Sequence, residues 1–270
     1  MKIQATTRVV YEYNPLAEVV SQIRFMNIGE ISKEEIENLL AEFSILGFTV
    51  HSEEVSYSIA HQFGPNGPLP VPVIGPQNRI HFFSSEDGTW RASVCSEFLA
   101  LSCFSYQSWD VFYPKFLSLA KCFFANSTAV QPTRLGLRYK DVIEREPLGL
   151  EACAWHELIA PFLLGPLAPN SLADGQVAEE SDVMNFLAQS QFKLDDAMLL
   201  LQSSLLTTAD GERRAFLIDA DFYHEGSIAQ EVLSDSDLLL KQLESLHSNA
   251  GALFRRGITE RLHDVLCRKS

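Results

Sequence analysis

Hydrophobic and polar positions alternate with two different periods along the chain. The segment that begins at Leu16 has a period of two, with Val19 and Ile23 on one side and Glu18 and Arg24 on the other. A period of two is typical of a strand with one face in water. We therefore expect the first regular element of the chain to be a half-buried strand.

Other segments show the spacing of amphipathic helices. Ser32 and Glu35 form the S-x-x-E capping box ahead of an apolar stripe, and Thr259 can cap a last short helix near the end of the chain. Residues 106–123 and 234–256 carry apolar residues at helical spacing over several turns. The sequence therefore predicts a mixture of strands and amphipathic helices.

Two matching hexapeptides suggest an internal repeat. The pattern D-G-x-x-R-A occurs at residues 87–92 and 210–215, each time between two strand-like runs that lead into a long amphipathic helix. Asp-Gly is also a strong signal for a tight hairpin turn, so two independent turns would produce the same match. Both explanations stay open: a duplicated β-hairpin-plus-helix unit, or two unrelated hairpins.

Together these elements predict an α+β fold. We expect largely antiparallel sheets with long amphipathic helices packed on one face. We also expect an N-terminal α+β half over residues 1–147 and a C-terminal α+β half over residues 148–270, packed together as one compact unit. A chain of 270 residues is long enough to bury a sizeable core in this way.

The amino-acid composition indicates which kinds of molecule the protein can bind. Hydrophobic residues make up 46% of the chain and charged residues 21%, which is typical of globular proteins. Asp and Glu number 35 against 21 Lys and Arg, so the formal net charge is −14. This charge repels phosphate backbones and anionic lipids, so we expect no direct nucleic-acid binding and no membrane binding. It favours solubility, or a basic protein partner.

Cysteine usage and the N-terminal sequence indicate a compartment. The five cysteines lie in apolar segments without a C-x-x-C pair, which predicts reduced thiols. The N-terminus lacks the long apolar run of a signal peptide, and no stretch approaches the about 20 apolar residues of a membrane-spanning helix. We therefore expect a cytoplasmic protein. The cysteines are Cys95, Cys103, Cys122, Cys153 and Cys267.

No known catalytic motif occurs in the sequence, so we assign no catalytic residue and expect no cofactor. The strongest candidate for a metal site is Asp219 with Asp221, two carboxylates on one face of a predicted strand that could share a Mg²⁺ or Mn²⁺ ion. A functional site would need a third ligand, and none has a recognisable spacing. The alternative is the wet face of an amphipathic strand.

Charged residues also gather on two predicted strands. Glu18 and Arg24 lie on the polar side of the first strand, and Arg134 and Arg138 lie on one side of a strand over residues 134–143. If the two strands pair, Glu18 would bond Arg138 and leave other guanidinium groups to bind an anion or a partner's carboxylate. The alternative is a structural network of weak ion pairs.

Three short motifs carry a family resemblance. The segments NPLAEVVSQIRF at residues 14–25, RLGLRY at residues 134–139 and FRRGITE at residues 254–260 resemble a sporadically distributed bacterial family of uncharacterised proteins. In that family an Asp-x-Asp strand corresponds to residues 217–222. The family pattern usually carries Asn two residues after the Tyr of the second motif, where this chain has Asp141.

The resemblance implies a setting and no assigned activity. Its patchy distribution is typical of genes on mobile islands, where defence systems and toxin–antitoxin pairs collect. This implies a non-enzymatic protein-binding module, such as an accessory, immunity or antitoxin-like component, with a partner encoded by a neighbouring gene; a homo-oligomer is a further option. Two alternatives remain: a metal-dependent hydrolase or nuclease using Asp219 and Asp221, and a sensor of an anionic small molecule at Arg134 and Arg138.

Overall fold

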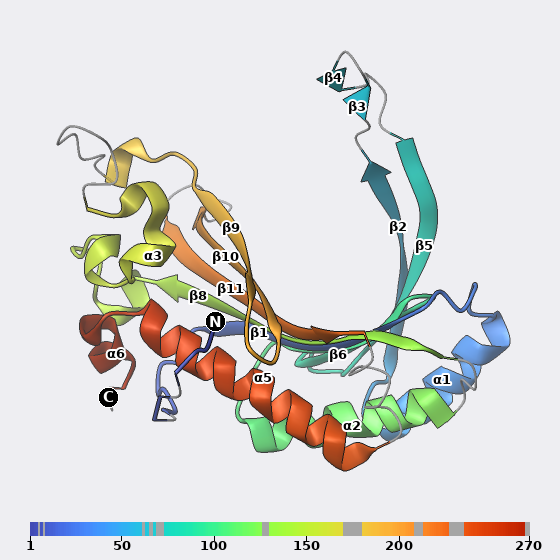
Figure 1. The fold of residues 1–270 in the computed structure, drawn as a ribbon. Helices are drawn as coiled ribbons and strands as arrows, with labels where there is room; N and C mark the ends of the chain where they lie inside the picture. Colours follow the sequence, from blue (N-terminus) through green and yellow to red (C-terminus); the bar gives the residue numbers. More distant parts are fainter. Residues whose placement is uncertain are drawn as a thin grey trace. The chain divides into compact units, whose positions relative to one another are not determined.

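A computed structural model gives the fold of the chain (Figure 1). It describes residues 1–4, 6–7, 9–60, 63–64, 67–68, 73–125, 130–169, 180–207, 213–226 and 235–267. Strands and helices mix along the described sequence, and the strands pair antiparallel in β2–β5, β5–β6, β6–β7, β9–β10 and β10–β11. The expected α+β class with largely antiparallel pairing is therefore confirmed.

The central feature is a nine-stranded sheet with the strand order β2-β5-β6-β7-β1-β8-β11-β10-β9. A separate two-stranded ladder consists of β3 and β4. The strand bounds are β1 Leu16–Phe25, β2 Val50–Ala60, β3 Phe63–Gly64, β4 Gly67–Pro68, β5 Val73–Ser84, β6 Trp90–Cys95, β7 Phe98–Cys103, β8 Pro132–Glu144, β9 Leu187–Lys193, β10 Met198–Thr207 and β11 Arg214–Glu225.

The helices differ widely in length. The α-helices are α1 Lys33–Ile45, α2 Trp109–Ala125, α3 Pro161–Leu164, α5 Ser236–Gly257 and α6 Glu260–Leu266. Short 3₁₀ turns are η1 Glu146–Leu148, η2 Trp155–Glu157, η3 Gly165–Leu167 and η5 Glu180–Asp182. Among the described residues, no helix combines the length and the apolar character needed to cross a bilayer.

The chain forms two compact units. Unit 1 comprises Met1–Val20 and Leu135–Ser270, and unit 2 comprises Ser21–Arg134. The expected division of the sequence after residue 147 stays a prediction, as does the packing of the helices on one face.

Local signals in unit 2 work as the sequence predicts. The side chain of Ser32 accepts a hydrogen bond from the Glu35 amide, and the Glu35 carboxylate accepts one from the Ser32 amide. The capping box at the start of α1 is therefore present. Gly88 takes a φ of 71° in the turn between β5 and β6, which confirms the expected hairpin. Phe43 and Phe83, both fully buried, meet edge to face in the core.

Unit 1 is built around β8, β9, β10 and β11. The apolar face of β11 includes Phe216 and Ile218, and α5 packs along this strand with a stripe that includes Leu243 and Leu246. The Thr259 side chain accepts a hydrogen bond from the Leu262 amide, which confirms the expected cap of α6. These elements bury most of the large apolar side chains of the unit.

The chain makes a tight turn between β9 and β10, two antiparallel strands that are neighbours in the sheet. The turn closes with a hydrogen bond from the Leu194 amide to the Ala197 carbonyl at 2.8 Å. The turn contains neither Gly nor Pro, but Asp195 and Asp196 lie in it, and Asp also favours turns.

The duplication stays a prediction. Around its first copy, β6 leads into β7 before α2 begins, so one more strand lies there than the repeat anticipated. The second Asp-Gly turn, at residues 210 and 211, lies outside the described residues. The structure therefore offers no comparison of the two turns.

Candidate functional site

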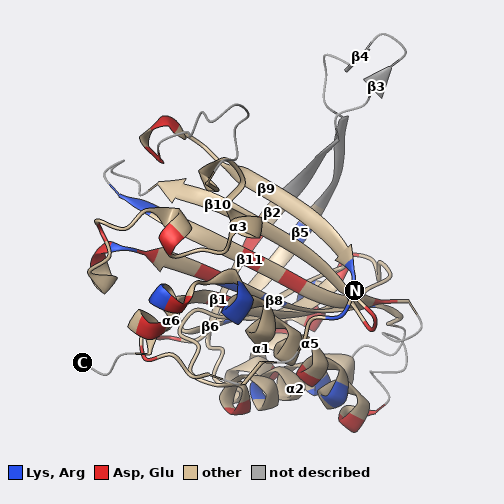
Figure 2. Cartoon of the chain, turned by 60° about the vertical axis from the view of Figure 1, so that its left-hand side comes forward, with Lys and Arg blue, Asp and Glu red and all other residues tan. Residues whose placement is uncertain are grey.

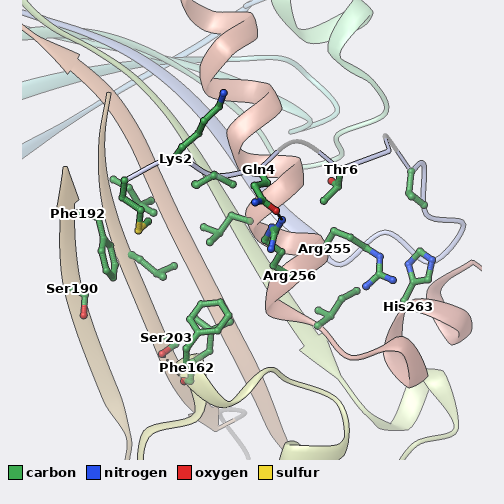
Figure 3. A pocket seen from close by; sticks show the side chains of 18 of the residues that line it. Lys2, Gln4, Thr6, Phe162, Ser190, Phe192, Ser203, Arg255, Arg256 and His263 are labelled. Carbon is green, nitrogen blue, oxygen red and sulfur yellow. Dashed lines mark hydrogen bonds between the residues drawn. The ribbon is translucent and has the colours of Figure 1, made fainter. Parts of the chain in front are cut away.

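A pocket of about 1330 Å³ lies within unit 1, beside the N-terminal segment (Figure 3). Its walls come from β9 and β10, from α3, from the C-terminal end of α5 with α6, and from seven N-terminal residues: Met1, Lys2, Ile3, Gln4, Thr6, Thr7 and Val9. The pocket therefore joins the first residues of the chain to elements near its end. No sequence motif marked it.

Backbone hydrogen bonds hold the N-terminal segment in place. At one end, the Asp195 amide in the β9–β10 turn donates to the Met1 carbonyl at 3.1 Å. At the other end, the amides of Glu12 and Tyr13 both donate to the Leu266 carbonyl, at 3.0 and 3.1 Å. The segment thus crosses the wall of the pocket between two anchor points.

Strands β9 and β10 supply an apolar floor. In their antiparallel register Phe192 lies opposite Leu199, and Ser190 lies opposite Leu201, with all four side chains on the pocket side. Leu199 and Leu201 are almost fully buried. Phe162 of α3 extends this apolar surface, and its side chain is 57% exposed. A large aromatic ring that stays this exposed beside a pocket is available to contact a ligand.

The opposite wall carries positive charge. Arg255 and Arg256 form the last turn of α5, and Figure 3 shows them across the pocket from Phe192. Arg255 donates to a carboxylate oxygen of Glu260 at 2.5 Å. Arg256 donates instead to the neutral amide oxygen of Gln4 at 3.1 Å. In the described part of the chain no ion pair involves Arg256, so its charge is not neutralised by a neighbour.

His263 closes this wall at its far end. The Tyr11 hydroxyl lies 3.1 Å from Nδ1 of His263, and the two rings meet edge to face. Burial is the main reason that the pKa of Tyr11 rises to about 12, so its phenol stays neutral at any physiological pH. Cys267, an exposed free thiol, lies 3.9 Å from the same imidazole.

The charged residues expected from sequence form different pairs. Arg138 on β8 donates two hydrogen bonds to Asp219 on β11, at 2.6 and 2.5 Å, and Lys140 donates to Glu18 at 2.5 Å. The prediction that Glu18 bonds Arg138 is therefore wrong. Its premise, that the two strands are neighbours, is correct for β1 and β8. The reason is that β8 has a second neighbour, β11, which presents a better bidentate partner.

The other sequence candidates lie apart from this pair. Arg24 lies 3.8 Å from Glu97 within unit 2, and both side chains are largely exposed. Arg134 is half-buried on β8. None of the four charged residues predicted to bind a ligand lines the pocket; they are Glu18, Arg24, Arg134 and Arg138. Their role in binding stays a prediction.

Asp219 and Asp221 both belong to β11, and Figure 2 shows acidic positions along this strand. Arg138 donates hydrogen bonds to both oxygens of the buried Asp219. These bonds are the main reason that the pKa of Arg138 is raised, and the charges of Asp219 and Asp221 add to the effect. The described residues contain one cluster with metal-ligand geometry, and it does not include this pair. The structure thus lends no support to a Mg²⁺ site here, and that site stays a prediction.

Asp141 is the most perturbed acid of unit 1. Its side chain lies fully inside the protein on β8, and burial, with the nearby charge of Asp219, raises its pKa to about 8. A carboxyl group in this state is mostly protonated at neutral pH and behaves as a polar neutral group. The sequence identified this position only as a departure from the pattern of the resembling family.

Comparisons with known proteins leave the family open. No family model matches the chain, and no curated protein matches it. Two solved structures of an RNA triphosphatase are similar at 8% and 7% identity: "S. pombe Pct1 RNA triphosphatase in complex with the Spt5 CTD" and the same enzyme alone. The alignments cover 97% and 96% of this chain and 88% and 87% of theirs, with TM-scores of 0.15 and 0.16. Scores this low carry no argument about fold or function.

Proposed function

We propose that this protein binds a small anionic amphiphile, a molecule with a carboxylate or phosphate head and an apolar tail, in the pocket of unit 1. The observation that carries the proposal is the position of Arg256, a guanidinium without an ion pair among the described residues, opposite an apolar floor. The anionic head of such a ligand would pair with Arg256 while its apolar tail contacts the apolar floor. No step of chemistry on the ligand is implied.

The apolar side chains of the pocket support binding of an apolar tail. Phe192 of β9, Leu201 of β10 and Phe162 of α3 all line the pocket. Burying an apolar tail there gains about 25 cal/mol for each Å² removed from water. A small ion such as acetate would gain none of this, so it is expected to bind far more weakly than a long-chain carboxylate.

The head group would lie near the last turn of α5. Arg256 can exchange its bond to the neutral Gln4 for a charge-assisted bond to an anion, which is roughly twice as strong. Arg255 already bonds Glu260 and is less available. We therefore propose Arg256, and not Arg134 or Arg138, as the residue that binds the anionic head group.

A thermal-shift series tests the proposal. Decanoate and decyl phosphate should raise the melting temperature of the full chain, whereas acetate, inorganic phosphate and the neutral decanol should shift it much less at equal concentration. Changing Arg256→Ala should weaken decanoate binding about tenfold, the effect of losing one charge-assisted hydrogen bond. Arg261→Ala is the matched control, because Arg261 is paired with Glu157 and does not line the pocket.

Two results would overturn the proposal. One is equal stabilisation by decanol and decanoate, which would remove the role of charge. The other is unchanged decanoate affinity in Arg256→Ala, with Arg261→Ala also unchanged. Increasing salt should weaken decanoate binding in the wild-type protein, because Arg256 is exposed and salt screens exposed charges.

A protein-binding function is a second candidate, favoured by strand β9. This strand ends the order of the sheet, and most of its side chains are exposed. An edge strand with unpaired backbone groups can receive an extended segment of a partner. The partner would be the product of a neighbouring gene, as the family resemblance implies. Co-purification with each neighbouring gene product tests this, and the absence of any stable complex would count against it.

A further inference from the structure

Helix α6 presents three metal-binding side chains on one face. Glu260, His263 and Asp264 are spaced at i, i+3 and i+4, so they project from the same side of the helix. One ligand atom from each lies within 4.8 Å of the others. Among the described residues, no other group of this kind occurs.

These distances are close to those around a bound ion. Zinc binds imidazole nitrogen and carboxylate oxygen at about 2.0–2.2 Å, so the ligand atoms of one site lie roughly 3–4 Å apart. Glu260 and Asp264 are exposed, and a small change of rotamer would bring their oxygens within this range. The helix backbone need not move.

Tyr11 provides the support that a metal-binding histidine normally has. A histidine ligand usually directs its second ring nitrogen to an oxygen of the protein, which orients the ring. The Tyr11 oxygen lies 3.1 Å from Nδ1 of His263. With Nδ1–H donating to that oxygen, Nε2 keeps its lone pair for the metal. Tyr11 is itself held by an edge-to-face contact with Phe254, with ring centroids 5.5 Å apart.

Two neighbouring groups tune the site. Arg255 donates a hydrogen bond to Oε1 of Glu260, so the second oxygen of that carboxylate is left to bind the ion. The positive charge of Arg255 lowers the affinity of the site for a cation. The thiol of Cys267 lies 3.9 Å from the His263 ring, which adds a soft donor nearby. One imidazole with two carboxylates and a nearby thiol suits zinc or cobalt better than magnesium or calcium.

We propose that Glu260, His263 and Asp264 form a binding site for a divalent transition-metal ion of the zinc class, oriented by Tyr11. Glu260 and His263 also line the pocket, so the ion would lie at its wall. The site goes beyond the binding of an anionic amphiphile and does not depend on it. A metal ion at this position would offer a second point of attachment for an anionic head group.

The test is a titration of the tag-free 270-residue chain with Co²⁺ and Zn²⁺, followed by visible absorption and calorimetry. One equivalent should bind to the wild-type protein. His263→Ala and Asp264→Asn should each lower the affinity at least tenfold, and His156→Ala, a change of an exposed histidine outside the cluster, should leave it unchanged. Asp264→Asn covers the case in which His263→Ala fails to fold, because Asp264 is exposed.

The positioning role of Tyr11 has its own readout. Tyr11→Phe should weaken metal binding roughly tenfold, the size typical for loss of a supporting hydrogen bond, while a purely structural role would change only the melting temperature of the metal-free protein. Cys267→Ser should retain binding, and a loss of binding there would overturn the three-ligand assignment.

The two proposals fail independently. The absence of one-equivalent binding in the wild type, or an affinity in His263→Ala and Asp264→Asn that equals that of the wild type, would overturn the metal site. The decanoate experiment, carried out in the presence of a chelator, is unaffected by that result. Failure of decanoate to bind would equally leave the metal titration intact.

Discussion

Arg138 on β8 and Asp219 on β11 are joined by two parallel hydrogen bonds, from Nε to Oδ1 at 2.6 Å and from Nη2 to Oδ2 at 2.5 Å. The carboxylate is 5% exposed and the guanidinium 42% exposed, so the pair lies at the boundary between core and solvent. An acid this deeply buried depends on its partner for the hydrogen bonds that water would otherwise supply.

Removing the arginine should therefore be costly. We expect Arg138→Ala to lower the free energy of unfolding by about 2–3 kcal/mol, below the 3–5 kcal/mol of a fully buried pair because Arg138 is partly solvated. Urea denaturation measures the change. Arg24→Ala, which breaks a surface pair with Glu97 at 3.8 Å, is the control and should cost less than about 1 kcal/mol. Equal losses in the two variants would contradict the structural role of the Arg138 pair.

Asp141 should make the stability depend on pH. Its pKa is about 8 in the folded protein, above the ordinary value of 3.8, so between these values the folded state holds a proton that the unfolded state has released. The contribution of this group therefore falls as pH rises from about 4 to 8, by up to about 1.4 kcal/mol per pH unit. Urea unfolding across this range should show the decline.

Asp141→Asn is the matching variant, because an amide cannot ionise and Asn is the residue that the resembling family usually carries at this point. The difference in unfolding free energy between this variant and the wild type should move in favour of the variant as pH rises from 5 to 8. A constant difference over that range would mean that Asp141 does not titrate there in the folded protein.

Two glycines with positive φ differ in the space around them. Gly165 has a φ of 51°, and a Cβ built there would lie 2.3 Å from the ring of Phe186. Gly149 has a φ of 66° and nothing within 4 Å of such a Cβ. Gly149→Ala should cost about 1–2 kcal/mol from backbone strain alone. Gly165→Ala should cost about 1–3 kcal/mol more, because of the clash and because its ψ of −120° lies outside the left-handed region that Gly149 occupies. Similar losses in thermal or urea unfolding would show that Phe186 moves freely aside.

Thr259 gives a prediction about α6 and the pocket wall. Its hydroxyl donates to the Glu157 carbonyl at 2.7 Å and accepts from the Leu262 amide at 3.4 Å. Thr259→Ala should cost about 1–2 kcal/mol in unfolding free energy, whereas Thr259→Ser should cost less because it keeps the cap. If Thr259→Ser and Thr259→Ala lose the same amount, the methyl group and not the cap is responsible.

Much of the local structure was predictable from short-range patterns. The alternation from Leu16, the capping box at Ser32, the Asp-Gly turn before β6 and the cap at Thr259 all lie where the sequence placed them. Each depends on residues within a few positions of one another, so the sequence contains all the information that decides it.

The contacts of the candidate binding residues were harder to predict from the sequence, because they depend on which strands become neighbours. Sequence placed Glu18 and Arg138 on polar strand faces, but it could not show that β8 lies between β1 and β11, so the partners Lys140 and Asp219 were not foreseen. The pocket had only a faint signal in the paired arginines at the end of a helix, which fit equally well with a favourable interaction with the helix dipole.

The sequence by itself determined the class of fold, the caps and the acidic charge, since these follow from composition and from contacts a few residues apart. Only the tertiary structure decided that the first residues of the chain would meet β9, α5 and α6 around one cavity. The physical reason is separation along the chain: Gln4 and Arg256 are 252 residues apart, and no local pattern reports which distant side chains a fold will bring to 3.1 Å.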